Sequence, residues 1–203
     1  MIKNEIKINE HINYFQKEQK EQKQHKQRKI VILGFRGVGK TSITTRFISG
    51  FFEKKYQPTI ENSYKKTIEF FGNEYLVEIV DTPGQDESTI LPFAYNIGTD
   101  AFVFVYTISS KTSFKIMKSL KDKVTENYGN ILKIIVGNQC DRKNQREVSF
   151  EEGIALAREW ECQFLECSAK EDYNTMKVFL SILQEVEKKM NPIIKKRKEC
   201  TIL

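Results

Sequence analysis

The chain has 203 residues, of which 39% are hydrophobic and 30% charged, and its formal net charge is +6. This length suits one α/β domain with a sizeable core and leaves little room for a second. No apolar run approaches the roughly 20 residues that a membrane-spanning helix needs, which excludes a transmembrane protein. The four cysteines show no metal-ligand spacing and follow no apolar secretion signal, so we expect reduced thiols in the cytosol.

Composition divides the chain into three parts. Residues 1–28 are polar and repetitive in Lys, Gln and Glu, so we expect a disordered or transiently helical extension with no core of its own. The alternative for this segment is a partner-binding helix built on Ile6, Ile8, Ile12, Tyr14 and Phe15. Residues 29–190 form the expected domain, and residues 191–203 form a basic tail. Because the basic residues concentrate at the two ends, the charge favours a membrane surface over nucleic acid.

Strand-like and helix-like segments alternate from residue 29 onward. We expect strands at 30–34, twice within 61–80, and at 101–107, 131–137 and 163–167. We expect helices at about 39–50, 111–127, 151–160 and 171–190. The alternation predicts an α/β fold with a mixed, mostly parallel six-stranded sheet and helices on both faces. Ligands of such sheets bind at the carboxyl ends of the strands.

A complete phosphate-binding loop spans residues 34–42, which read Gly-Phe-Arg-Gly-Val-Gly-Lys-Thr-Ser. Gly34 and Gly39 let the backbone wrap a polyphosphate closely, and the helix that follows aims its positive end at the same anion. Lys40 then reaches the β and γ phosphates, while the Thr41 hydroxyl suits a magnesium ion that bridges them. The residues expected to contact the nucleotide here are Arg36, Gly37, Val38, Gly39, Lys40, Thr41 and Ser42.

The second motif, Asp-Thr-Pro-Gly-Gln at residues 81–85, closes a strand pattern. Asp81 is an acid suited to holding magnesium, directly or through water. Gly84 can bring its amide to a γ phosphate, and Gln85 can orient an attacking water for in-line transfer. Together with the phosphate loop, this motif indicates hydrolysis of the nucleotide.

Two further motifs follow successive strands and indicate the base. The Asp141 carboxylate can accept from both N1 and the exocyclic amine of guanine, a pair of donors that adenine lacks. Asn138 can tie its loop either to the phosphate loop or to the base N7. Ser168, Ala169 and Lys170 form the last motif, which can turn a backbone amide toward the guanine carbonyl oxygen. The order of the motifs predicts a site for GTP and GDP.

These four motifs in this order resemble those of the Ras superfamily of small GTPases, and the resemblance covers residues 29–190. The segment Tyr-Gln-Pro-Thr-Ile-Glu-Asn-Ser at residues 56–63 resembles a Ras-branch effector loop. The chain is most similar to the Rheb subfamily, because Arg36 replaces the usual glycine and residues 149–153 and Trp160 fit that subfamily. The resemblance implies a P-loop NTPase fold and slow, partner-stimulated GTP hydrolysis.

The resemblance also implies roles for individual residues. Thr59 would reach magnesium and the γ phosphate only in the GTP state, so that the nucleotide selects between two surfaces. Phe52 would pack on the base, Tyr56 would cover the phosphates, and the stem of Lys170 would lie on the other face of the purine. The metal site is expected at Thr41, Thr59 and Asp81, and catalysis at Lys40, Thr59, Gly84 and Gln85. The effector loop is expected at Tyr56, Pro58, Thr59, Ile60, Glu61 and Asn62.

Three residues depart from the family pattern. Arg36 projects where a partner's arginine finger would enter, so we expect slow intrinsic hydrolysis and an activating partner that supplies something other than arginine. Pro83 replaces the usual alanine and fixes φ, which either slows hydrolysis or only stiffens the loop. Gln139 replaces a lysine and removes a charged contact, so we expect GDP to be held more weakly by about 1–2 kcal/mol.

The last four residues, Cys-Thr-Ile-Leu, form a Cys-a-a-X prenylation signal at Cys200. A terminal Leu favours geranylgeranyl over farnesyl. The basic run at residues 195–198 precedes it, and a lipid beside such a run anchors a protein to an anionic leaflet. We therefore expect a prenyltransferase to modify the chain, which would be cytosolic before prenylation and then bind the cytoplasmic face of a membrane.

The expected function is a membrane-anchored GDP/GTP switch, and the Rheb resemblance implies a role upstream of growth control through the TOR kinase complex. Its expected partners are an effector that binds switch I, the loop that carries Thr59, together with a GTPase-activating protein and an exchange factor. One alternative is a Ras- or Rap-type switch that feeds a kinase cascade. The other is a non-hydrolysing, GTP-bound binding module, which the three departures from the family pattern favour.

Overall fold

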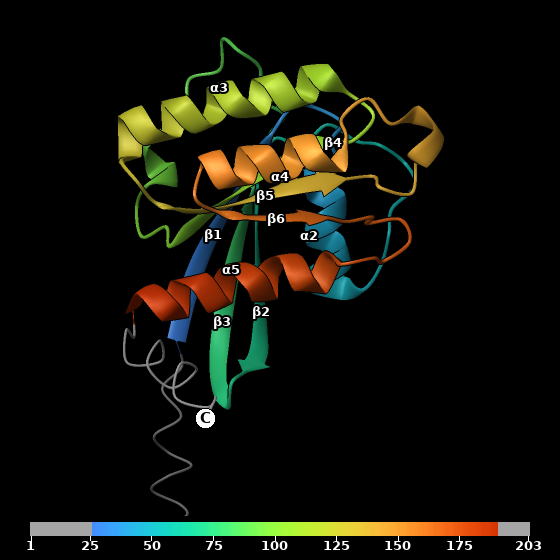
Figure 1. Ribbon diagram of the computed structural model, residues 1–203. Helices are drawn as coiled ribbons and strands as arrows, with labels where there is room; N and C mark the ends of the chain where they lie inside the picture. Colours follow the sequence, from blue (N-terminus) through green and yellow to red (C-terminus); the bar gives the residue numbers. More distant parts are fainter. Residues whose placement is uncertain (1–25, 191–203) are drawn as a thin grey trace, which may run out of the picture.

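The computed structural model describes residues 26–190, and Figure 1 shows a central sheet between two layers of helices. The six strands lie in the order β2-β3-β1-β4-β5-β6. Their bounds are β1 Lys26–Gly34, β2 Asn62–Phe70, β3 Asn73–Asp81, β4 Ala101–Thr107, β5 Leu132–Asn138 and β6 Gln163–Glu166. β2 and β3 are antiparallel, and every other neighbouring pair is parallel. The predicted mixed, mostly parallel six-stranded sheet is confirmed.

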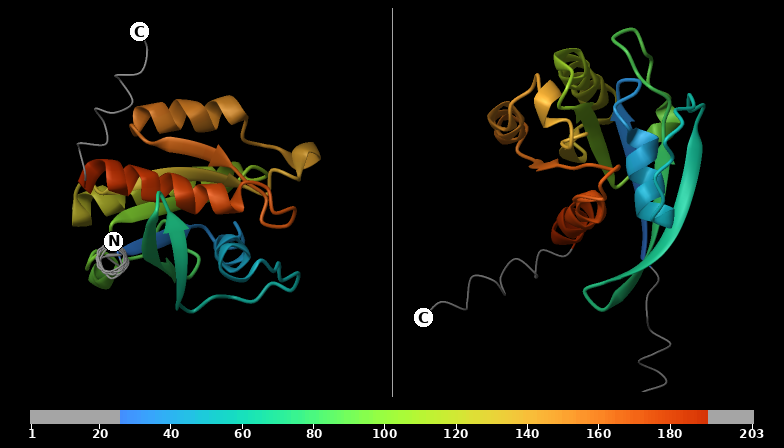
Figure 2. Two further views of the ribbon diagram at one scale, coloured as in Figure 1. Left: turned by 90° about the horizontal axis from the view of Figure 1, so that it is seen from below. Right: turned by 90° about the vertical axis from the view of Figure 1, so that its right-hand side faces the viewer.

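Within residues 26–190, four helices cover the two faces of this sheet (Figure 2). Their bounds are α2 Lys40–Ser49, α3 Lys111–Tyr128, α4 Phe150–Glu159 and α5 Thr175–Met190, with two 3-10 turns, η1 Phe93–Tyr95 and η2 Lys143–Gln145. Helices α2 and α5 bury their apolar side chains on one face of the sheet, and α3 and α4 on the other. Within the described residues, no helix is both long and apolar enough to span a bilayer.

The middle strand β4 contributes to both cores, as its apolar run predicts. All of its residues are buried. Successive side chains of a strand point to opposite faces, so Val103 and Val105 pack with α2 and α5, whereas Phe102 and Phe104 pack with α3 and α4. This sheet is the rigid base that positions the loops at its carboxyl edge.

Strand β1 begins at Lys26, earlier than expected, so residues 26–28 are strand rather than part of the polar extension. The cause is a buried carboxylate on α5. Glu187 is 4% exposed and accepts from Lys26 Nζ at 2.9 Å and from Arg28 Nη2 at 2.5 Å. Burial alone would raise the pKa of Glu187, but these two cations outweigh it and the pKa falls. Residues 1–25 and 191–203, with Cys200, lie outside the described part of the chain.

Helix α5 begins at Thr175 rather than near residue 171, because the last motif closes a loop of its own. Ser168 and Tyr173 form an isolated antiparallel bridge, and their main-chain groups exchange hydrogen bonds of 2.9 and 3.0 Å. Asp172 and Asn174 then have φ of 54° and 59°, which a continuing helix does not allow. The loop holds the last motif at the carboxyl edge of β6.

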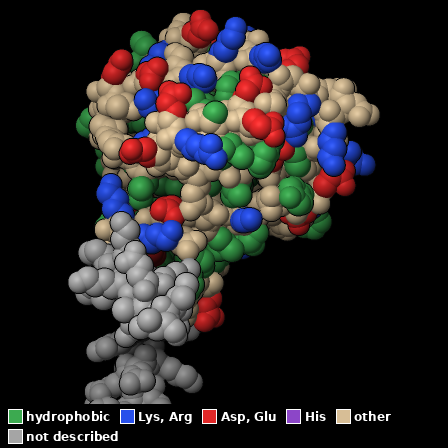
Figure 3. All heavy atoms as spheres, viewed as in Figure 1, with side chains coloured by type: hydrophobic (Ala, Val, Ile, Leu, Met, Phe, Trp, Pro, Cys, Tyr) green, Lys and Arg blue, Asp and Glu red, His purple; other side chains and the backbone are tan. Residues whose placement is uncertain are grey.

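Charged side chains of both signs are mixed over the face that carries α3, α4 and α5 (Figure 3). In this view Lys and Arg side chains alternate with Asp and Glu side chains and with small apolar areas. The visible face therefore has no broad basic surface of the kind that binds nucleic acid.

Candidate nucleotide-binding site

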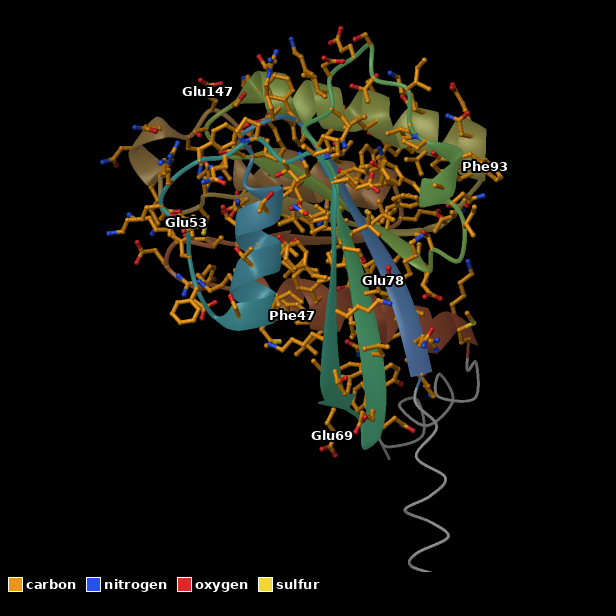
Figure 4. The ribbon with its side chains drawn as sticks, turned by 180° about the vertical axis from the view of Figure 1, so that it is seen from behind. Phe47, Glu53, Glu69, Glu78, Phe93 and Glu147 are labelled. Carbon is orange, nitrogen blue, oxygen red and sulfur yellow. The ribbon has the colours of Figure 1, made fainter. Side chains whose placement is uncertain are left out.

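A cavity of about 660 Å³ lies between the phosphate loop, the loop that follows α2 and the residues just after β3. The lining residues are Arg36, Gly37, Gly39, Lys40, Thr41, Ser42, Thr45, Phe52, Glu53, Lys54, Lys55, Tyr56, Gln57, Thr59, Thr82, Gly84, Gln139 and Arg142. In Figure 4, Glu53 lies on the loop after α2, well away from Glu69 at the tip of the β2–β3 hairpin. The cavity is at the carboxyl edge of the sheet, where the sequence predicts a ligand.

A second, smaller cavity of about 80 Å³ shares part of this wall and is bounded by the two base-recognition motifs. Its lining residues are Gly39, Ser42, Phe52, Asn138, Gln139, Asp141, Arg142, Ala169 and Lys170. We call the larger space the phosphate cavity and the smaller one the base cavity. All four motifs thus meet at one place, although they are spread over more than a hundred residues.

The phosphate loop turns directly into the amino end of α2. Gly39 precedes the helix with φ of 91°, and no side chain of the described residues caps the free amides of the first turn. Because those amides lack a partner within the helix, they are available to an anion. A Cβ at Gly39 would lie 2.3 Å from Asn138 Nδ2, so the loop and the base motif need glycine here to pack together.

Gly34 and Val38 support the phosphate loop through contacts with the protein itself. The Gly34 amide donates to Gln85 Oε1 at 2.8 Å, and a Cβ at Gly34 would meet the Val105 carbonyl at 2.2 Å. Val38 is 1% exposed and its carbonyl accepts from Asn138 Nδ2 at 2.8 Å. Neither residue lines either cavity. Both fix the shape of the phosphate loop from behind.

The Lys40 side chain lies against the main chain of the phosphate loop. Its side chain is buried, and Nζ donates to the carbonyls of Gly34 at 2.7 Å and Phe35 at 3.2 Å. Burial lowers the pKa of Lys40 to about 8, although the nearby Asp81 carboxylate acts in the opposite direction. A bound triphosphate would favour the charged form, because opposite charges stabilise each other.

Three side chains whose oxygens suit a hard metal ion lie together near the end of β3: Thr41, Thr59 and Asp81. The hydroxyls of Thr41 and Thr59 are 2.8 Å apart, so switch I already touches the phosphate loop. Within residues 26–190 neither Asp81 carboxylate oxygen has a hydrogen-bond partner of normal geometry, and both are buried. Burial raises the pKa of Asp81, while the Thr41 hydroxyl and the Lys40 cation act to lower it. An unpartnered buried carboxylate beside two hydroxyls fits a magnesium ion.

The Gln85 side chain does not lie in the phosphate cavity, where the sequence predicts that it orients the attacking water. Its side chain is 2% exposed, accepts from the Gly34 amide, and donates from Nε2 to Thr82 Oγ1 at 2.7 Å. Gln85 therefore lies behind the phosphate loop and does not line the cavity. Gly84 does line it, and a Cβ there would lie 2.5 Å from the Arg36 Cα. The loop after β3 that carries Gly84 and Gln85, which is switch II in the family, thus packs directly on the phosphate loop.

Of the two roles expected for Asn138, the structure has the tie to the phosphate loop. Its Nδ2 donates to Val38, and its Oδ1 accepts from the Ala169 amide at 3.4 Å. Asp141 Oδ1 accepts from Ser168 Oγ at 2.6 Å, and Asp141 Oδ2 lies 4.0 Å from Lys170 Nζ. Asn138 therefore joins three of the four motifs, and the other contacts fix the Asp141 carboxylate at the base cavity.

Gln139 still braces the phosphate loop, without a charge. Its Nε2 donates to the Gly37 carbonyl at 3.2 Å, and its Oε1 accepts from Thr107 Oγ1 at 2.8 Å. The expected loss of a lysine contact is therefore partly offset by a neutral hydrogen bond to the same loop. Both polar atoms of the amide are used by the protein itself.

The loop after α2 carries the aromatic and effector residues. Phe52 lines both cavities, with the Arg46 guanidinium 5.9 Å from its ring centre. Tyr56 lines the phosphate cavity and is 67% exposed, while Ile60 is 90% exposed. The remaining effector-loop residues Pro58, Glu61 and Asn62 are also exposed. Glu61 accepts from the Tyr95 hydroxyl at 2.6 Å, which ties the loop to η1.

The sequence alone did not point to four lining residues with chemical interest: Lys54, Lys55, Thr82 and Arg142. Lys54 and Lys55 add positive charge at the mouth of the phosphate cavity. Thr82 orients Gln85, which no pattern reveals. Arg142 directly follows Asp141 in the sequence, and this position next to a base-recognition carboxylate is a signal that indicates a place at the nucleotide site.

Comparison with known proteins agrees with this site. The Ras family model matches residues 29–188. The chain is 46% identical over 163 residues to the GTP-binding protein Rheb homolog of Dictyostelium discoideum, covering 79% of this chain and 88% of that protein. It is 41% identical over 178 residues to the human GTP-binding protein Rheb, covering 87% and 97%. The chain therefore belongs to the Ras family of small GTPases, within the Rheb subfamily, and is a GTP hydrolase.

Proposed function

We propose that this GTPase is a slowly hydrolysing, membrane-anchored switch that signals to the TOR kinase complex and growth control, as its resemblance to Rheb suggests. The observation that carries slow hydrolysis is the position of Gln85. Its amide is bonded to Gly34 and Thr82 and is buried away from the phosphate cavity. A glutamine in that position cannot orient the attacking water without leaving both partners.

The nucleotide roles follow from the two cavities. Lys40 and the free amides of α2 bind the β and γ phosphates, while Asp141 binds the guanine edge between Phe52 and Lys170. Magnesium would be held by Thr41, Thr59 and, directly or through water, Asp81, where it would neutralise charge that develops on the transferred phosphate.

The two nucleotide states differ at Thr59 and Gly84. With GTP, the Thr59 hydroxyl and the Gly84 amide would turn to the metal and the γ phosphate, ordering both switch loops. Loss of the γ phosphate would release Thr59 and the exposed loop that carries Tyr56 and Ile60. An effector that binds this loop would therefore distinguish GTP from GDP.

Replacing Gln85 by Leu should lower the single-turnover rate of GTP hydrolysis by less than about threefold, because the amide does not face the phosphates. The protein would be loaded with GTP in magnesium and the released phosphate followed over time. General base or positioning groups ordinarily contribute about 100-fold or more, so a loss on that scale would show that Gln85 turns into the site during catalysis. Complete absence of hydrolysis in the unaltered chain would favour the non-hydrolysing binding module instead.

Membrane anchoring rests on the Cys-a-a-X signal and the basic run before it. Helix α5 ends at Met190. In Figure 1 this end of α5 lies far from the amino end of α2, which borders the phosphate cavity. A lipid attached beyond that helix would leave the effector loop facing the cytosol. The partners of this arrangement would be a prenyltransferase, an anionic leaflet, an activating protein, an exchange factor and the effector.

Cys200→Ser should move the protein from the membrane fraction to the soluble fraction of a cell lysate. A single prenyl group with a basic cluster supplies the binding energy, and the cluster alone gives about 1 kcal/mol per charge. The matched control is Cys162→Ser, which alters a thiol inside the domain. If Cys200→Ser stays with the membranes, another attachment is responsible. Binding of the GTP form to TOR-complex components or to Ras-binding domains would separate the growth output from a kinase cascade.

A further inference from the structure

Arg142 lies at the junction of the phosphate cavity and the base cavity and lines both. The other residues common to the two walls are Gly39, Ser42, Phe52 and Gln139. Arg142 is thus the only charged side chain on the shared wall, as far as residues 26–190 define it. Any ligand that fills both cavities at once must pass this guanidinium.

The backbone of Arg142 is fixed, while its side chain is available. Its amide donates to the Gln139 carbonyl and its own carbonyl accepts from the Gln145 amide, both at 2.9 Å. The guanidinium has no hydrogen bond, ion pair or ring contact with any residue in the described part of the chain, and the residue is exposed. The loop therefore presents an uncommitted cation at a defined place.

Gln139, the neighbour of Arg142 on this wall, cannot act on a ligand in the same way. Its Oε1 is taken by Thr107 and its Nε2 by Gly37. It also carries no charge, so it cannot form an ion pair with a phosphate. On the wall that the two cavities share, Arg142 is the residue that can offer a cation to a phosphate at this junction.

We propose that Arg142 is an affinity-determining residue that clasps the bound guanine nucleotide where its base and phosphates meet. Its guanidinium donates a charge-assisted hydrogen bond to the phosphate nearest the base and replaces the charge that Gln139 lacks. The nucleotide is then enclosed by Phe52 on one side and Arg142 on the solvent side. This inference rests on the guanine-nucleotide site proposed above, and it adds Arg142 to the expectation that the lysine missing at Gln139 weakens GDP retention.

The test is the rate at which radiolabelled GDP leaves the full chain in magnesium when excess unlabelled GDP is added. Arg142→Leu keeps an apolar stem but removes the cation, and should speed GDP release about tenfold, the scale of one charged hydrogen bond. Lys143→Ala is the matched control, because Lys143 is the next residue, is exposed and lines neither cavity. It should change the rate by less than about twofold, since surface charges interact weakly.

A second pair of variants distinguishes a nucleotide contact from a local structural role. If Arg142 replaces the missing charge, Gln139→Lys should rescue Arg142→Leu, so that the double variant releases GDP nearly as slowly as the unaltered chain. Raising the salt concentration should also reduce the difference between Arg142→Leu and the unaltered chain, because ions screen exposed charges. Independent, additive effects of the two substitutions would overturn the proposal.

The outcomes also separate this proposal from the function on which it rests. If the unaltered chain binds no GDP, guanine-nucleotide binding itself fails. If the unaltered chain binds GDP and Arg142→Leu releases it no faster than Lys143→Ala does, only the role of Arg142 fails. Faster release from Arg142→Leu that is independent of salt and is not rescued by Gln139→Lys would assign Arg142 to loop structure, and would also overturn the proposal.

Discussion

Lys40→Met should lower the affinity for GDP and GTP by at least about 100-fold, the scale of two lost charged hydrogen bonds. Lys40 carries the one cation at the start of α2, and it faces the phosphate cavity from a buried position. Methionine keeps the length of the stem and removes only the charge. The affinity would be measured by competition against a labelled guanine nucleotide in excess magnesium.

Two further measurements show whether Lys40→Met loses nucleotide affinity because a phosphate contact is removed or because the protein is destabilised. The buried cation has a pKa lowered to about 8, so its charge is disfavoured in the empty site, and Lys40→Met should not lower the unfolding temperature of nucleotide-free protein. The unaltered chain should bind nucleotide well below pH 8 and progressively less well above it, as the free lysine loses its proton. In Lys40→Met this pH dependence should be absent. An affinity within tenfold of the unaltered chain would contradict the assigned role.

The parts of the site that follow from spacing along the chain could be predicted. The phosphate loop, the Asp81 motif and the base motifs each follow a strand, and parallel strands bring their carboxyl ends to one edge. That topology alone places Lys40, Thr41, Asp141 and Lys170 together. Asp81 is buried and without a partner of normal geometry among the described residues, which suits a metal ligand.

The parts that depend on the direction of one side chain could not be predicted. Gln85 has the sequence position of a water-orienting residue, yet the Gly34 amide and the Thr82 hydroxyl hold its side chain behind the loop. The start of β1 at Lys26 was also missed, because a polar strand end has no apolar pattern. Its cause is Glu187, a residue that lies more than 150 positions away along the chain. Local pattern carries no information about such partners.

Gly34→Ala should destabilise the folded protein by at least about 4 kcal/mol, a loss on the scale of the most severe single substitutions. A Cβ at Gly34 would lie 2.2 Å from the Val105 carbonyl oxygen and 3.1 Å from its carbon. Both atoms belong to the main chain of β4 in the middle of the sheet, so neither can move aside as a side-chain end could. Urea-induced unfolding with saturating GDP and magnesium would measure the change.

Gly72→Ala is the control for this substitution, because it separates backbone strain from steric overlap. Gly72 has φ of 71° in the β2–β3 turn, and a Cβ there would have no neighbouring atom within 4 Å among the described residues. Alanine there should cost only about 1–2 kcal/mol, the strain of a left-handed backbone. Similar losses at both positions would mean that overlap with β4 is not what requires glycine at Gly34. A much larger loss of stability at Gly34 would show that β4, which lies behind the phosphate loop, requires glycine at this position. The residue cannot move away from β4 freely, because its amide binds Gln85 and its carbonyl binds Lys40.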